Sequence, residues 1–299
     1  MSLWNQIARL VTDPPPNHLF EVSEAGIAFA HGKETSFEAL EPGTVVVSPV
    51  EDNLLRADAV AAAIGRVASS KTLRNSRNSA ISSKKRKPAA VILPDYAARV
   101  SVLDFDSFPS SLEEQNSLVR FRVKKTIPFD IDSAAVSHHV QPHPASKKVD
   151  VIAVTVALEV IARYEALFRS SGFQPGVVTT SALAALNLYR ITDGDGVGVL
   201  AKLSGRALTV SVISSNIVKL FRCVALEEAS EEEILGVLHP TFAYVEDELG
   251  SPVSRLITCG IPQEILGRLK CEVEPLRSRF GTPGPYNAGL LGYLESVEN

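Results

Sequence analysis

The stretch that decides the fold spans residues 91–132 and reads VILPDYAARVSVLDFDSFPSSLEEQNSLVRFRVKKTIPFDID. An apolar run typical of a buried strand stops at Pro94, and residues 98–103 then alternate with the period of two that a strand has. Residues 110–114, SSLEE, predict a helix start, because a hydroxyl cap and early glutamates complement the free amides of a helix N-terminus. The stretch therefore predicts two strands followed by a helix.

Residues 118–125, LVRFRVKK, can be interpreted in two ways. Their apolar side chains alternate with basic ones, as in a strand, but they also lie close enough in sequence to share one face of a helix. Periodicity alone slightly favours a strand. The segment is followed by the Ile-Pro-Phe sequence of residues 127–129.

Taken together, LPD at residues 93–95, the glutamate pair at 113–114 and RFRVKKTIPFDID at 120–132 resemble the PilM family, cytoplasmic actin-like proteins of type IV pilus assembly. The resemblance continues into residues 150–156, 164–172 and 175–188 and covers most of the chain. It implies that residues 118–125 form a helix ending at the Ile-Pro-Phe corner. The related possibility is the cytoplasmic, actin-like part of GspL, from type II secretion.

The resemblance implies an α/β, actin-like (ribonuclease H-like) fold of two lobes with a small α+β insertion subdomain. PilM-like and FtsA-like proteins carry such an insertion in place of part of the first actin lobe. The expected domains are an N-terminal amphipathic helix and proline spacer (residues 1–17), the first lobe (18–99 and 174–192), the insertion subdomain (100–173) and the second lobe (193–299).

Periodicity within these domains predicts further elements. Helices are expected at residues 58–68, 159–171, 181–189 and 286–294, with another ending at residue 249. Strands are expected at residues 44–48, 134–140, 149–156, 197–202, 207–213, 217–222 and 255–259.

The composition is that of an ordinary soluble globular protein: of 299 residues, 45% are hydrophobic and 21% charged, with a net charge of −4. This balance indicates no nucleic-acid partner. Cys223, Cys259 and Cys271 are far apart, which favours reduced thiols over a disulfide framework or a zinc site. Because no apolar stretch reaches the roughly 18–20 residues that a membrane span needs, we expect a cytoplasmic protein. The resemblance implies that it reaches the inner membrane through partners.

Two segments have the composition of contact surfaces. Residues 1–11, MSLWNQIARLV, predict an amphipathic helix that either contacts the inner membrane surface or a partner, or docks on its own domain. The basic run KKRK at residues 84–87 suits lipid headgroups or nucleic acid, or is a solvated loop. No metal site is expected at His138, His139 and His143, because adjacent strand residues face opposite ways and no carboxylate or cysteine completes a ligand set.

The first of the three turns that hold a nucleotide in an actin-like fold is expected at residues 23–26, between strands at 19–22 and 27–30. Set beside the actin-like pattern, Glu21 falls where an aspartate would be and Ser23 where a glycine would approach phosphate, and Gly26 ends the turn. Glu21 is one methylene longer, and Ser23 does not adopt positive φ as cheaply as glycine. The alternative is a plain surface hairpin.

The second and third turns depart further from the pattern. At residues 202–206, KLSGR, Lys202 replaces the aspartate and Ser204 replaces the glycine, followed by Gly205. At the third turn the family places a Gly-Gly pair beneath adenosine, and only Gly260 remains.

ATP hydrolysis by this fold needs acidic residues that hold Mg²⁺ and orient water, and Lys202 reverses that charge. We therefore expect a pseudo-ATPase without catalytic residues, which binds ATP and Mg²⁺ weakly if at all. The leading hypothesis is a scaffold of a type IV pilus machine. The resemblance implies the N-terminal cytoplasmic tail of a PilN-like inner-membrane protein as partner, docked beside the insertion. Other pilus machine subunits and a second copy of the chain are further candidates.

Two alternatives stay open: an active ATPase of the same family, and a GspL-like secretion scaffold. The sequence contains no P-loop, GxSxG, HExxH or post-strand GxGxxG motif that would indicate another enzyme class.

Overall fold

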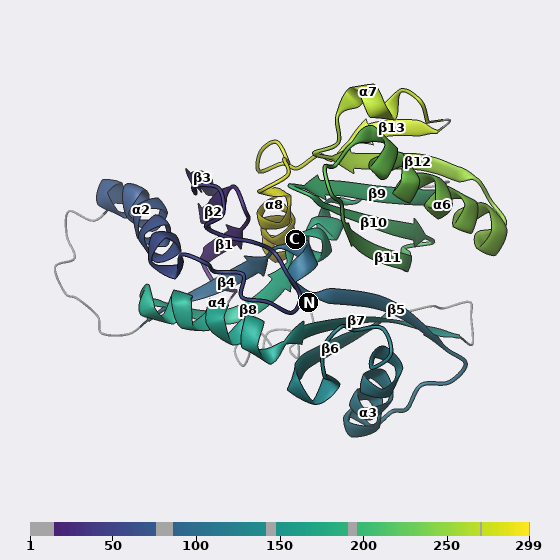
Figure 1. Cartoon of the computed structure of the whole chain (residues 1–299), viewed down its shortest axis with the longest axis horizontal. Coiled ribbons are helices and arrows are strands. Elements are labelled where there is room, and N and C mark those ends of the chain that lie inside the picture. The colour runs from purple at the N-terminus through teal and green to yellow at the C-terminus, as the bar shows by residue number, and fades with distance from the viewer. Residues whose placement is uncertain (1–14, 76–85, 142–147, 191–195, 270, 299) are drawn as a thin grey trace, which may run out of the picture.

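The computed structural model describes residues 15–75, 86–141, 148–190, 196–269 and 271–298, which form two lobes and a smaller subdomain (Figure 1). Each of the three units is built on its own sheet. The helix expected at residues 1–11, part of the basic run at 84–87, His143 and most of the linker before residue 196 lie outside the described residues.

The first lobe is a five-stranded sheet in the order β3-β2-β1-β4-β8. Its strands are β1 (His18–Val22), β2 (Gly26–His31), β3 (Glu34–Ala39), β4 (Lys87–Leu93) and β8 (Phe173–Thr180). The first three form an antiparallel meander, whereas β1, β4 and β8 run parallel. Helices α2 (Ala57–Asn75) and α4 (Leu158–Ser170) cover one face, where the Phe20 ring lies 5.1 Å from the Phe168 ring of α4.

The second lobe repeats this topology. Its five-stranded sheet has the order β11-β10-β9-β12-β13, formed by β9 (Val197–Ser204), β10 (Ala207–Ser214), β11 (Ile217–Ala225), β12 (Val253–Cys259) and β13 (Glu272–Pro275). Helices α6 (Glu231–Leu249) and α7 (Gln263–Leu266) belong to this lobe, and Ser230 and Glu233 form a capping box at the start of α6. The structure confirms the expected three-stranded meander, the helix that ends at residue 249 and the strand that ends at residue 259.

Helices α5 (Ser181–Ala185) and α8 (Ala288–Glu298) lie between the two sheets (Figure 1). Their core includes Leu19 and Ile92 from the first sheet and Leu200 and Ile257 from the second. The helix expected at residues 181–189 continues past α5 only as a short 3-10 turn. Among the described helices, none is both long and apolar enough to cross a membrane.

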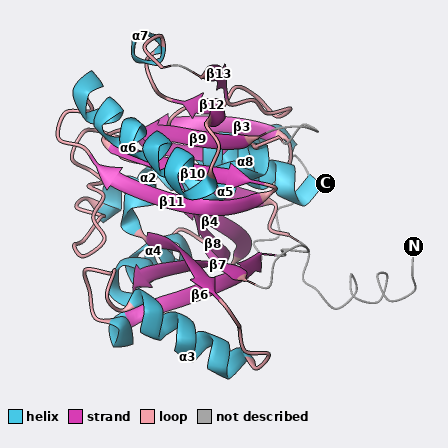
Figure 2. Cartoon of the chain, turned by 90° about the vertical axis from the view of Figure 1, so that its right-hand side faces the viewer, coloured by secondary structure: helices cyan, strands magenta, loops and turns pink. Residues whose placement is uncertain are grey.

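The insertion subdomain is a three-stranded sheet in the order β5-β7-β6 with helix α3 (Leu112–Val123) packed on it (Figure 2). Its strands are β5 (Arg99–Phe105), β6 (Ala134–Gln141) and β7 (Val149–Ala157). Its other face turns toward the second lobe, where β5 lies beside β11. The Gln141 side chain bonds both backbone groups of Val218 there, at 2.8 and 2.9 Å, so the insertion is attached to the second lobe as well as to the first.

Two findings differ from what periodicity favoured, and one differs from the expected domain boundaries. Residues 118–123 are helical, as the resemblance implied, because Val119 and Val123 face the sheet while Phe121 is 69% exposed. Residues 44–48 form no strand: Val45 makes only an isolated bridge to Leu54. Helix α4, which we placed in the insertion, contributes its apolar side chains to the core of the first lobe.

Candidate functional site

The carboxyl ends of parallel strands from both lobes meet between the two sheets. In the first lobe they carry Glu21 on β1, Asp95 just after β4 and Ser181 just after β8, and in the second lobe Lys202 on β9. Strand alternation turns Glu21 away from the outer core that holds Phe20 and toward α8. Because ligand sites of α/β sheets lie at such carboxyl ends, this is the candidate functional site.

Lys202 and Asp95 form a buried ion pair that joins the two lobes. Lys202 Nζ donates to Asp95 Oδ2 at 2.9 Å, and both side chains are 1% exposed. Asp95 Oδ1 accepts the amide hydrogen of Ala182 at 2.5 Å. Burial lowers the pKa of Lys202, but the Asp95 and Glu21 carboxylates outweigh burial and the net shift is upward. The ammonium therefore keeps its proton between the lobes.

Glu21 lies beside this pair and is anchored by two other elements. The Ser181 hydroxyl donates to Oε1, and the Leu290 amide of α8 donates to Oε2 at 2.7 Å. Burial raises the pKa of Glu21. Lys202, the Ser181 hydroxyl and the Leu290 amide lower it by less, so the net shift is upward. One lysine thus serves two buried carboxyl groups.

The first predicted turn closes on itself. The Ser23 amide donates to the Gly26 carbonyl at 2.9 Å, and the Ser23 hydroxyl donates to the same carbonyl at 2.8 Å. The Gly26 amide in turn donates to the Ser23 hydroxyl oxygen at 3.1 Å. Since bonds within the turn already use these two amides, they do not offer free donors to a phosphate.

The glycines of the other two turns differ in how tightly they are packed. Gly205 has a φ of 56°, and a Cβ there would be 2.5 Å from the carboxylate oxygen of Glu24, a flexible side chain that can move. Gly260 has a φ of 76°, and a Cβ there would overlap the Leu203 carbonyl oxygen. Backbone packing therefore requires glycine at position 260 for a reason that needs no ligand.

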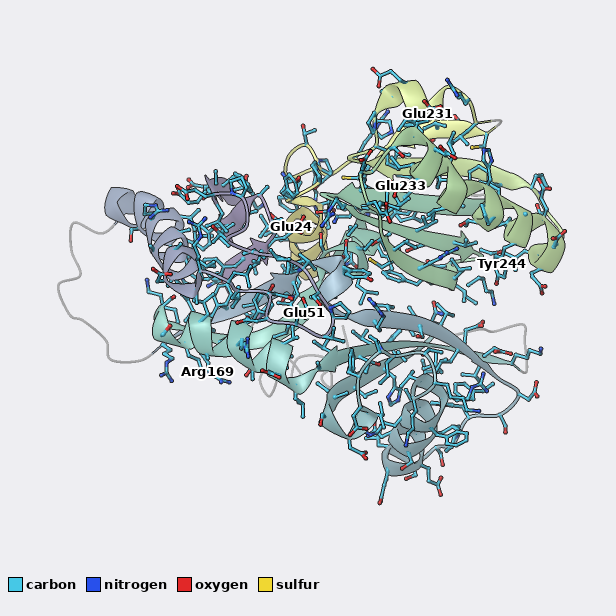
Figure 3. The ribbon with its side chains drawn as sticks, viewed as in Figure 1. Glu24, Glu51, Arg169, Glu231, Glu233 and Tyr244 are labelled. Atoms are coloured by element: carbon cyan, nitrogen blue, oxygen red, sulfur yellow. The ribbon has the colours of Figure 1, made fainter. Side chains whose placement is uncertain are left out.

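A cavity of about 260 Å³ lies between the lobes above this network. Its polar lining includes Ser23, Glu24 and Tyr96 from the first lobe and Ser204, Arg206 and Glu227 from the second. Figure 3 shows Glu24 at this junction. This volume is just below the range of about 300–1,000 Å³ that is usual for drug-sized ligands. Of the predicted site residues, Ser23 and Ser204 line this cavity. Glu21 and Lys202 lie in the buried network beneath it. The three predicted glycines, Gly26, Gly205 and Gly260, do not line it.

The residues that hold Glu21 and Lys202 were not predicted. Asp95 lies 107 positions before Lys202 and was not among the predicted site residues. The available signal was a buried strand ending in LPD, which places a carboxylate at the carboxyl edge of the sheet. Ser181 and the Leu290 amide carry no sequence signal of this kind.

No family model and no curated protein matches the chain, but solved structures match nearly all of it. The PilM-PilN type IV pilus biogenesis complex matches 96% of this chain and 99% of that chain, with a TM-score of 0.69 and 14% identity. A Bacteroides thetaiotaomicron protein with an actin-like ATPase fold and unknown function matches 98% of each chain, with a TM-score of 0.54 and 11% identity. The fold is actin-like.

A third actin-like match is the cytoplasmic domain of EpsL, an inner membrane component of the type II secretion system of Vibrio cholerae. It covers 94% of each chain, with a TM-score of 0.50 and 13% identity. The actin-like fold predicted from the resemblance, with its two lobes and its small antiparallel sheet, is therefore confirmed.

An actin-like fold implies ATP and Mg²⁺ in the cleft between the lobes, and the residues here fit that group poorly. The Lys202 ammonium would repel a divalent cation, and it already engages Asp95. The cavity between the lobes is lined by the Glu24 and Glu227 carboxylates as well as by the Arg206 guanidinium, so its charge is mixed rather than suited to phosphates. Within the described part of the chain, no group of three or more His, Cys, Asp or Glu residues is arranged to hold a metal ion.

Proposed function

We propose that this chain is a nucleotide-independent scaffold of a type IV pilus machine, on the cytoplasmic side of the inner membrane. The observation that carries the proposal is the Lys202–Asp95 ion pair, which fills the base of the cleft in a fold that matches the PilM structure over 96% of the chain. The proposed partner is the N-terminal cytoplasmic tail of a PilN-like inner-membrane protein, because the matched PilM structure is a complex with PilN. No ATP turnover is proposed.

The tail is proposed to dock where the first lobe meets the insertion subdomain. The loop before α2 exposes Val46 and Val50, and Leu158 is exposed at the start of α4, directly after β7. An ion pair between Asp52 and Arg163 joins this loop to α4, so these side chains flank the junction. Figure 3 shows Glu51, in the same loop, between the first lobe and the insertion subdomain. Exposed apolar side chains on both sides of a junction suit an extended peptide.

The test is binding of a synthetic peptide with the tail sequence of the PilN-like protein from the same organism, measured by isothermal titration calorimetry. Val50→Glu and Leu158→Glu change side chains that are 50% and 47% exposed, so the fold should tolerate both. We expect each to weaken the affinity about tenfold or more, since 1.4 kcal/mol is a factor of ten. The matched control is Phe121→Glu, because Phe121 is exposed on α3 and outside the proposed groove.

Equal affinity of the wild type and both groove variants, or no binding at all, would overturn the proposed function. Deleting residues 100–173 is not a usable test, because it removes α4 from the core of the first lobe. A GspL-like secretion scaffold is the second candidate, favoured by the EpsL match. Tighter binding of a type II secretion tail peptide than of the pilus peptide would select it.

A further inference from the structure

The carboxyl groups around Lys202 are positioned without help from the lysine. Asp95 Oδ1 is fixed by the Ala182 amide at 2.5 Å, and Glu21 Oε2 by the Leu290 amide at 2.7 Å. The Ser181 hydroxyl fixes the other Glu21 oxygen. These donors belong to the central helices α5 and α8, so both carboxyl groups are held in place by elements that do not include β9.

The charges of this cluster need a cation. Glu21 and Asp95 are both buried, and buried carboxylates are costly unless a positive charge or strong donors compensate them. Within the described residues, the ammonium of Lys202 is the charged partner that the structure gives Asp95, and it also attracts Glu21. It comes from the second lobe, whereas both carboxyl groups come from the first.

We infer that Lys202 is a tethered cation that takes the place of a divalent ion in the cleft: its ammonium pairs with Asp95, attracts the nearby Glu21, and pins the two lobes together without metal or nucleotide. Carboxylate oxygens are the ligands that Mg²⁺ and Mn²⁺ prefer, and the lysine charge beside them repels such an ion. The inference rests on the same account of the cleft as the proposed function, but it does not depend on the partner tail.

The first test is Lys202→Asp, which removes the ammonium and adds a third carboxylate on a shorter side chain, leaving room for an ion where Lys202 Nζ lay. Binding of Mn²⁺ alone is followed by electron paramagnetic resonance, and the melting temperature is measured with EDTA and with Mn²⁺. We expect the variant to bind Mn²⁺ at least tenfold more tightly than the wild type. We also expect Mn²⁺ to raise its melting temperature while leaving that of the wild type unchanged. Adding Asp95→Asn to this variant should abolish both the tighter Mn²⁺ binding and the rise in melting temperature with Mn²⁺.

A folded Lys202→Asp protein that binds Mn²⁺ no better than the wild type would overturn the inference, and so would a gain that survives Asp95→Asn. Lys202→Met covers the case in which the charge reversal does not fold. We expect it to lower the melting temperature by on the order of 10 °C, because it leaves a buried carboxylate unpaired. Lys202→Met with Asp95→Asn removes both charges of the pair and should recover most of that loss.

The matched control is Lys219→Met, which breaks the more exposed ion pair with Asp150 between the second lobe and the insertion. It should lower the melting temperature much less than Lys202→Met. If Lys202→Met is as stable as the wild type, the ammonium does not pin the lobes and the inference is wrong. Because tail binding is measured separately on the wild-type chain, failure of the proposed function is distinguishable from failure of this inference.

Discussion

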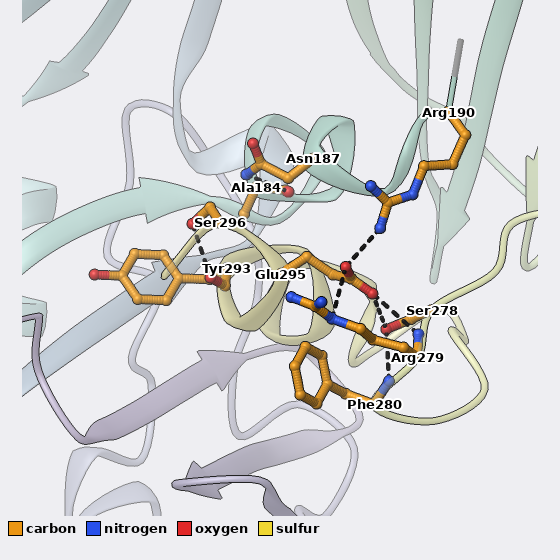
Figure 4. Close-up of polar contacts among 9 residues, drawn as sticks. All are labelled: Ala184, Asn187, Arg190, Ser278, Arg279, Phe280, Tyr293, Glu295 and Ser296. Atoms are coloured by element: carbon orange, nitrogen blue, oxygen red, sulfur yellow. Dashed lines mark hydrogen bonds and ion pairs between the residues drawn. The ribbon is translucent and has the colours of Figure 1, made fainter. Parts of the chain in front are cut away.

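Glu295 is the buried carboxylate that ties α8 to the segments around Arg190 and Arg279 (Figure 4). The Arg190 guanidinium donates to it at 2.6 Å, the Arg279 amide at 3.0 Å and the Ser278 hydroxyl at 3.2 Å. Burial raises the pKa of Glu295, but the Arg279 amide, the Ser278 hydroxyl and Arg190 outweigh it, so the net shift is downward. The ionised form is therefore the one that the fold stabilises.

This direction predicts how Glu295→Gln behaves with pH. A carboxyl group whose folded pKa is depressed contributes stability above its unfolded pKa, and loses it as the pH falls through the folded pKa. We expect Glu295→Gln to lower the free energy of unfolding by about 1–3 kcal/mol at neutral pH, and by less in acid. Urea denaturation at about pH 7 and about pH 3 measures both values. Equal losses at the two pH values would contradict this account of Glu295.

The residues of the cleft could be predicted from the sequence only in part. Lys202 in place of an acidic residue could be predicted by setting the chain beside a family pattern. Its partner could not, because Asp95 reaches Lys202 only through the packing of two lobes, across 107 positions. The hydrogen bonds that close the Ser23–Gly26 turn could not be predicted either, since they depend on a side-chain rotamer rather than on residue type.

At the scale of elements, the contact between α5 and α8 depends on the small residues of α8. A Cβ at Gly292 would overlap the Ala184 carbonyl oxygen, and one at Gly289 would lie 2.7 Å from the Ser181 Cα. Because backbone atoms line this contact, no flexible side chain can move to make room. The close approach in turn holds the Leu290 amide against Glu21.

We therefore expect Gly292→Ala to be destabilising although alanine is the better helix former. The overpacking should cost about 1–3 kcal/mol or more. The matched control is Gly236→Ala in α6, where nothing lies within 4 Å of the added methyl group. There the same change should stabilise the protein by up to about 1 kcal/mol through helix propensity. Thermal unfolding of both variants measures whether their melting temperatures shift in opposite directions. A shift in the same direction in both would contradict the packing argument.

Periodicity predicted most elements but not the nature of α3. Its sheet-facing side chains are few, Val119 and Val123, and Phe121 points into solvent, so the apolar pattern of a buried helix face is weak. The resemblance carried information that periodicity lacked. Residues 44–48 were also expected to form a strand, but this apolar run covers the first-lobe core as a loop.

At the scale of the whole molecule, interactions within the chain hold the two lobes and the insertion together. Lys202 and Asp95 join the lobes directly, and the Gln141 side chain with the Lys219–Asp150 pair joins the insertion to the second lobe. The resemblance predicted two lobes and an insertion. It did not predict that the insertion also contacts the second lobe, because that contact links a side chain to the backbone of Val218, 77 positions away.

The central claim is that this actin-like chain works as a scaffold without a nucleotide. The most direct measurement is the affinity of the wild-type protein for the PilN-like tail peptide with Mg²⁺ alone and with Mg²⁺ and ATP, with phosphate release followed in the same samples. We predict the same affinity within about twofold, a difference below about 0.5 kcal/mol, and no phosphate release. A tenfold change in affinity on adding ATP, or ATP turnover that Glu21→Gln removes, would contradict the claim.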